Sequence, residues 1–302
     1  MENCRIGKNG RQVQDSRLLE AGFGLDDCAV VVDCSDLELA CVLCNWFGFR
    51  DGGEALSSIG PVIKVWRKGS VYMLRDGKAE VHAEGFSEAL GLLDAAFEWR
   101  LRSLASPSVL AMHSCAVRLG DGAAVIVGIS GAGKTTLGLA LAQAGLSLIG
   151  DEFGYLDSET GNYWNAEYPI ALKRDTAMSP AFRRVFERGI KMVSPYGVCS
   201  ELFPVRCVRD AIGSEGVCSI GGLPLRTLIF PSRIDGSSPS IKSLTVTELP
   251  RLLMPSIDGL GTRAQVFSRA LGVISRNGCA LIKVEYGDAK SASQAILAHL
   301  MD

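Results

Sequence analysis

The sequence lacks several features that would assign the protein to a specialised class. It has no uninterrupted apolar run near the roughly 18 residues that a membrane helix needs, so we expect a soluble protein with no membrane partner. It has no excess of one charge, with 31 basic against 33 acidic residues, which argues against nucleic acid as a partner. Residues 1–5 are polar and lack the apolar core of a signal peptide, which indicates the cytoplasm.

The ten cysteines do not form the pattern of a disulfide framework. They are scattered and several lie in apolar runs, as buried free thiols do in a reducing compartment. Four cysteines fall within 17 residues: Cys28, Cys34, Cys41 and Cys44. Among them, Cys41 and Cys44 have the spacing of a zinc half-site. Because the pair Cys41 and Cys44 lies in a predicted helix, we expect core packing, with structural zinc or a redox dithiol as the alternative.

A glycine-rich stretch at residues 128–136 matches the full phosphate-loop pattern G-x-x-x-x-G-K-[ST]. An apolar run at 123–127 predicts a buried strand before it, and residues 136–144 favour a helix after it. A dinucleotide motif does not fit, because it requires a glycine where Thr136 stands. A turn that binds nothing is the alternative to a phosphate-binding loop. The predicted nucleotide-binding residues are Gly128, Ser130, Gly131, Ala132, Gly133, Lys134, Thr135 and Thr136.

The chemistry of this loop predicts ATP and Mg²⁺ as cofactors. Glycines let successive N–H groups point inward, and the helix that follows adds the positive end of its dipole. We expect Lys134 to reach the β- and γ-phosphates and Thr135 to offer its hydroxyl to Mg²⁺.

The chain of 302 residues divides into two predicted parts. Residues 1–106 form a small α+β domain with a strand at 29–32, a helix at 37–47, a hairpin at 62–74 and an amphipathic helix at 87–104. Residues 107–302 form an α/β domain that begins with a hairpin, 114–119 and 123–127, whose second strand leads into the phosphate loop. Later predicted elements are strands at 146–150, 163–172, 225–230 and 280–286 and helices at 262–275 and 289–300.

Two neighbouring acids, Asp151 and Glu152, follow the strand at 146–150. Alternation along a strand would direct them to opposite sides, so that one holds Mg²⁺ with Thr135 while the other faces the acceptor. Two solvated acids at a strand end are the alternative. The arginines between residues 173 and 219 have two interpretations as well, a clamp for phosphate or an acidic acceptor, or solvated helix faces.

The segment from His113 and Ser114 through the phosphate loop to Gly145, Asp151 and Glu152 resembles the core of HPr kinase/phosphorylase and its relatives. Weaker similarity extends through residues 168–173 and 225–231. The resemblance implies a phosphoenolpyruvate-carboxykinase-like nucleotide fold with a mixed sheet. It also implies that Asp151 is the catalytic base and Glu152 a magnesium ligand, or the reverse.

The resemblance further implies that His113 and Lys134 lie near the transferring phosphate, with Lys173 a weaker candidate on the phosphate or acceptor side. From composition alone, His113 is equally well read as a packed core histidine. The sequence departs from HPr kinase proper at Glu152, at Thr136 and at residues 221–226, where the family has Asp, Glu and a Glu-Ile-Arg-Gly-Leu-Gly signature. HPr itself and the reverse phosphorolysis are therefore not implied.

Related members resemble kinases that act on serine hydroxyls, including those of lasso-peptide tailoring. We therefore expect an ATP-dependent kinase whose acceptor is a serine in a peptide or protein. A kinase for a small metabolite, a carboxykinase-like enzyme, and a nucleotide-binding interaction module without transfer are the alternatives. Whether the chain forms a homo-oligomer stays open.

Overall fold

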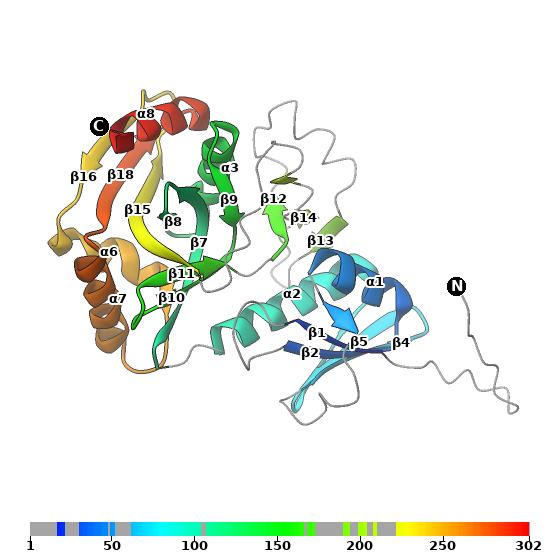
Figure 1. The fold of residues 1–302 in the computed structure, drawn as a ribbon. Coiled ribbons are helices and arrows are strands. Elements are labelled where there is room, and N and C mark those ends of the chain that lie inside the picture. The colour runs from blue at the N-terminus through cyan, green and yellow to red at the C-terminus, as the bar shows by residue number, and fades with distance from the viewer. Residues whose placement is uncertain are drawn as a thin grey trace, which may run out of the picture.

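The computed structural model describes residues 17–21, 30–47, 49–51, 62–103, 107–165, 168–172, 190–193, 199–203, 208–209 and 222–301. In these ranges the chain is a mixed α/β protein with one large mixed sheet, two smaller sheets and six α-helices (Figure 1). The expected α/β class is confirmed at this level. No α-helix within these ranges combines the length and apolar character that crossing a bilayer requires.

A six-stranded sheet and two helices occupy the described residues before position 104. The strands are β1 (Arg17–Ala21), β2 (Val30–Cys34), β3 (Arg50–Asp51), β4 (Ile63–Lys68), β5 (Val71–Asp76) and β6 (Ala79–Ala83). Their order is β3-β1-β2-β4-β5-β6, with only β2 and β4 parallel. The predicted hairpin is β4 and β5, which are antiparallel neighbours.

The helices α1 (Leu37–Trp46) and α2 (Phe86–Ser103) pack on this sheet. Asp36 caps α1 by accepting a hydrogen bond from the Leu39 N–H at 2.9 Å, as a short acidic N-cap residue does. α2 buries Leu90, Leu93 and Phe97, three residues with the spacing of one helix face, so the predicted amphipathic helix is confirmed. The core beneath them also contains Phe153 of the large sheet, which joins the two halves of the chain.

The large sheet contains nine strands, and one of them, β7, pairs with four others. The strands are β7 (Val109–Leu119), β8 (Gly122–Val127), β9 (Ser147–Gly150), β10 (Phe153–Asp157), β11 (Asn162–Asn165), β15 (Leu223–Arg233), β16 (Ser240–Ser243), β17 (Ile257–Asp258) and β18 (Ala280–Tyr286). The order is β11-β10-β7-β8-β15-β18-β16, with β9 and β17 also paired to β7, and β11 pairs back onto β15. β15 is parallel to β8 and β18, and the other pairs are antiparallel.

Both faces of this sheet are covered by helices, as the fully buried strand β8 requires. Ala124 and Ile126 pack in a core with α3 (Lys134–Gln143) and α8 (Ala289–Met301). Their neighbours Val125 and Val127 pack on the other side with α7 (Arg263–Asn277). α6 (Leu249–Leu253) lies on that second side (Figure 1), and Met254 of the 3₁₀ turn η3 (Met254–Ser256) packs against the same core. The 3₁₀ turn η2 (Val246–Glu248) comes directly before α6.

One predicted strand is wrong as a single element. Residues 163–172 divide between β11 in the large sheet and β12 (Ile170–Leu172) in a three-stranded sheet with β14 (Cys199–Phe203) and β13 (Ile190–Val193). Period-two alternation gives no sign of a change of sheet, which explains the error. The predicted domain boundary stays a prediction, and residues 104–106 lie outside the described ranges.

The positions of the cysteines agree only in part with the prediction that they pack in the core. Cys34 is buried and Cys44 is half-buried against the core, but Cys41 is exposed, so the packing prediction is wrong for Cys41. Burial raises the pKa of both the Cys34 and the Cys279 thiol to about 11, which keeps them neutral. Within the described ranges no group of three or more His, Cys, Asp or Glu side chains could hold a metal, and Cys28 lies outside them.

Candidate active site

The predicted phosphate loop spans the turn between β8 and α3, as expected from the sequence. Gly131 and Gly133 have φ values of 83° and 91°, a left-handed conformation that glycine adopts without steric cost. A Cβ on Gly133 would stand 2.3 Å from the Tyr286 hydroxyl oxygen, and that hydroxyl donates to the Gly133 carbonyl at 3.3 Å. The N-cap residue of α3 is Gly133, which has no side chain to cap the helix, so the first N–H groups of α3 are suited to bind an anion.

Lys134 is buried in the loop. Its ammonium group donates to the carbonyl oxygens of Gly128 at 3.0 Å and Ile129 at 3.3 Å. The loop backbone therefore holds the charged end of the side chain against the concave side where a polyphosphate binds in loops of this pattern. Of the other predicted loop residues, Ser130 is exposed at the tip and Thr136 is half-buried in the first turn of α3.

A direct hydrogen bond joins the loop to the acidic pair. The Thr135 hydroxyl donates to Asp151 Oδ2 at 2.8 Å. Asp151 is only 1% exposed, and its second oxygen, Oδ1, has no hydrogen-bond partner in the described part of the chain. Burial, and then the neighbouring charge of Glu152, raise the pKa of Asp151 to about 7. A buried carboxylate with one unsatisfied oxygen is the arrangement that a bound cation would relieve.

Glu152 lies at a kink between β9 and β10. Its φ of 69° makes it the one non-glycine residue with positive φ among those described, and such a conformation costs free energy that is tolerated mostly at functional sites. The Ser114 N–H donates to its carbonyl oxygen at 3.3 Å, which fixes the kink against β7. Its carboxylate Oε1 lies 3.3 Å from His113 Nδ1.

The two acids therefore point to different partners, but not for the expected reason. Asp151 and Glu152 belong to a bend rather than a strand, so strand alternation does not direct their side chains. The kink sends Asp151 under the phosphate loop and Glu152 toward His113 on β7.

Arg209 supports the strand that carries the acidic pair. Its buried guanidinium donates from Nε to the Leu148 carbonyl at 3.0 Å and from Nη2 to the Ile149 carbonyl at 2.5 Å. β9 has a register irregularity at this point, and the arginine satisfies two carbonyls of its last residues. The interpretation of Arg209 as a solvated side chain is therefore wrong, and its interpretation as a clamp for phosphate or an acidic acceptor stays a prediction.

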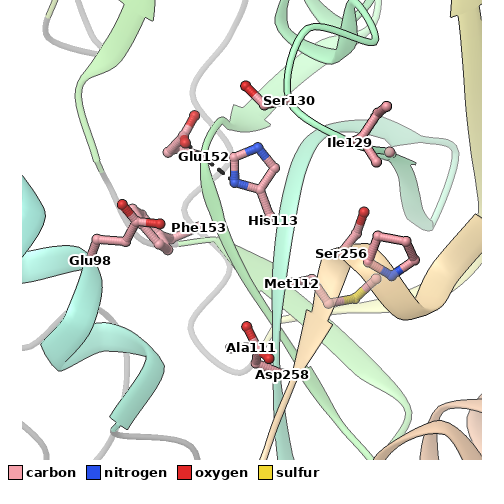
Figure 2. Close-up of a pocket in the computed structure, with 12 residues that line it drawn as sticks. Glu98, Ala111, Met112, His113, Ile129, Ser130, Glu152, Phe153, Ser256 and Asp258 are labelled. Carbon is pink, nitrogen blue, oxygen red and sulfur yellow. Dashed lines mark ion pairs between the residues drawn. The ribbon is translucent and has the colours of Figure 1, made fainter. Parts of the chain in front are cut away.

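A cavity of about 360 Å³ opens beside the loop and the kink (Figure 2). Its walls come from α2, β7, the phosphate loop, the kink and η3 with β17. Three acids, one histidine and two serines supply the polar groups, and the rest of the lining is apolar or glycine. The polar residues are Glu98, His113, Ser130, Glu152, Ser256 and Asp258. His113 thus lies in the cavity wall rather than in the apolar core, and its place near a transferring phosphate stays a prediction.

The cavity exists because β7 changes neighbours at His113. On one edge of β7, Met112 pairs with Ile257 of β17, and Ser114 pairs with Val127 of β8. Between these two pairs β8 ends in the phosphate loop and η3 leads away from the sheet, so a gap opens in the sheet beside His113. We call this gap, which lies between Gly128 and Ser256, the fork. Glu98, Ser256 and Asp258 come from distant segments without a motif, and no signal in the sequence connects them to the loop.

Comparison with known proteins adds no relative. No protein-family model matches the chain, and no curated protein matches it either. Lys173, the weaker candidate, lies outside the described residues.

Proposed function

We propose that the protein is an ATP- and Mg²⁺-dependent kinase that transfers the γ-phosphoryl group to a serine hydroxyl of a peptide or protein. One observation carries the proposal: the 2.8 Å hydrogen bond from Thr135 to Asp151, which puts an acidic pair directly beneath a phosphate loop. A glycine-rich turn that binds nothing has no need of a buried carboxylate at this position.

The loop supports nucleotide binding. The left-handed glycines, the uncapped start of α3 and the enclosed ammonium group of Lys134 together form a concave, donor-rich surface for phosphates. In the proposed reaction Lys134 exchanges its loop carbonyls for phosphate oxygens and offsets the charge that develops on them.

The residues present suit Mg²⁺. Thr135 and Asp151 would hold it, with Asp151 Oδ1 as an oxygen that accepts no hydrogen bond from the described residues, and Glu152 is the next residue. Mg²⁺ is commonly held by one or two carboxylates together with substrate phosphates, so a larger cluster of protein ligands is not needed. When bound, the metal would neutralise phosphate charge.

The geometry favours Glu152 as the group that takes the proton from the acceptor hydroxyl. Glu152 lines the cavity and contacts His113, whereas Asp151 is enclosed beneath the loop with Thr135. This is the reverse of the first assignment that the resemblance implies. His113 would orient the Glu152 carboxylate toward the acceptor.

The fold and the acceptor are supported less directly. The antiparallel hairpin that feeds the loop, with helices on both faces of a mixed sheet, agrees with the expected phosphoenolpyruvate-carboxykinase-like arrangement. The serine acceptor rests on the resemblance to HPr-kinase-related proteins. A metabolite acceptor would use the same loop and acids.

The test is incubation of the purified protein with γ-³²P-labelled ATP and Mg²⁺, together with an array of serine-containing peptides and a small-metabolite fraction. The proposal expects label on serine in a peptide and none with Glu152→Gln. Label only on a metabolite would support a small-molecule kinase. Tight ATP binding with no transfer to any acceptor would support an interaction module instead.

A further inference from the structure

The fork in the large sheet contains a buried polar group that the proposed phosphoryl transfer does not use. Ser256, at the end of η3, is 3% exposed, and its hydroxyl oxygen has no hydrogen-bond partner in the ranges that the structure describes. A buried hydroxyl without a partner costs free energy. Ser256 lines the cavity, and Figure 2 shows its hydroxyl directed to the side on which Ile129 of the loop lies.

The position of Ser256 is set by the strands around it. The next residue, Ile257, pairs with Met112 of β7, and His113 comes directly after Met112. Ser256 and the loop residue Gly128 therefore border the fork from its two sides, with His113 between them. A group that enters the fork meets Glu152 and His113 at one end and Ser256 at the other.

The other residues that line the cavity determine which kind of ligand fits into it. Ala111, Met112, Phe153 and Pro255 provide an apolar surface suited to aliphatic carbon. The ionisable lining residues apart from His113 are acids, Glu98, Glu152 and Asp258, which disfavour an anionic ligand.

We propose that the fork is the acceptor subsite of the kinase, in which Ser256 hydrogen-bonds an uncharged, serine-type residue and so determines specificity. This inference rests on the proposed function. Ser256 binds the amide or backbone polar group of the acceptor residue, while the hydroxyl that is phosphorylated lies toward Glu152. A site with a buried polar partner discriminates against ligands that leave that partner unpaired.

The experiment titrates N-acetyl-L-serinamide into protein saturated with Mg²⁺ and a non-hydrolysable ATP analogue, with binding followed by ligand-observed NMR. We expect Ser256→Ala to weaken binding roughly tenfold, with nucleotide affinity unchanged. Ser243→Ala, in exposed β16, is the matched control and should bind like the wild type. The anionic N-acetyl-L-serine should bind more weakly than the amide, and equal binding would overturn the uncharged class.

Thermal unfolding separates a ligand-binding role from a structural one. Since the Ser256 hydroxyl lacks a partner among the residues that the structure describes, Ser256→Ala should melt at the same temperature or higher, and a lower melting temperature would contradict the assignment. Equal binding of the serinamide by wild type and Ser256→Ala, or no binding by either, overturns the subsite. Probe binding that depends on Ser256, together with no phosphoryl transfer in the labelled-ATP assay described above, would overturn the proposed kinase and leave the fork standing as a binding site only.

Discussion

The two edges of β7 build their parts of the site in different ways. On one edge β8 leads into a continuous stretch of nine residues, 128–136, that forms the whole phosphate loop. On the other edge the acidic kink depends on residues from other segments of the chain, among them Thr135 in the loop above it and Arg209, which donates to β9 just before it. The loop edge is thus locally encoded, and the kink edge is assembled by the tertiary structure.

The largest effect should come from the two acids at the kink. We expect Glu152→Gln to lower kcat roughly 1000-fold with ATP affinity unchanged, because it removes the proposed proton acceptor. Asp151→Asn should instead raise the Mg²⁺ concentration needed for half-maximal activity. Steady-state kinetics over a range of Mg²⁺ concentrations distinguish the two variants, and an exchange of the two phenotypes would restore Asp151 as the base.

Asp94 should make stability depend on pH. Burial raises its pKa to about 7, with the charge of Glu152 adding to this, while Tyr168 donates a hydrogen bond to it at 2.5 Å. A carboxyl with a raised pKa binds its proton more tightly in the folded state. The free energy of unfolding should therefore fall as the pH rises from about 4 to about 7, and then level off.

Over this pH range Asp94 should lower the free energy of unfolding by up to about 4 kcal/mol. Denaturant unfolding of wild type and Asp94→Asn across this pH range measures it. The exposed acid Asp121 provides a control, Asp121→Asn. The same pH slope in Asp94→Asn as in the wild type would rule out this source.

Arg209 tests whether the kink edge depends on remote support. Arg209→Met leaves the Leu148 and Ile149 carbonyls without their donors, so we expect a loss of about 3 kcal/mol in unfolding free energy. The remaining folded protein should have a lower kcat and nearly unchanged nucleotide affinity. Arg118→Met is the control, because Arg118 donates to a carbonyl in an exposed turn. Equal losses in both variants would remove the contrast between the two edges.

The smallest effect concerns the loop edge. Gly133→Ala should destabilise the protein by about 2 kcal/mol, because φ is positive and the new Cβ meets the Tyr286 hydroxyl. The double variant with Tyr286→Phe removes the clash but not the strain in φ, so part of the loss should be recovered. A double-mutant cycle by chemical denaturation measures the coupling, and complete additivity would contradict the contact.

The difference between the two edges also explains what could be predicted from the sequence. The hairpin, the loop, α3 and the order of the C-terminal elements follow from local patterns and were predicted. The division of residues 163–172 between two sheets was missed, because alternation is the same in both. The conformation of Glu152 was missed because positive φ in a non-glycine residue has no signature in sequence.

In the candidate site, too, the residues in local motifs were predicted and the residues that depend on tertiary structure were not. The loop residues, His113 and the acidic pair are brought together as expected. Arg209 and Ser256 could not be predicted, because a single arginine or serine acquires its role only from the strands that surround it. The fork itself results from β7 pairing with β17 and β8 in succession, which is a long-range event.

The central claim, that the loop binds a triphosphate through Lys134, is tested most directly by calorimetric titration of Mg²⁺ and ATP into wild type and Lys134→Ala. Lys242→Ala, in an exposed ion pair, is the control. We predict that Lys134→Ala binds roughly 100-fold more weakly than the wild type, since it loses a charged donor to the phosphates, and that Lys242→Ala binds normally. Equal affinity in wild type and Lys134→Ala, or no binding by the wild type, would contradict the claim.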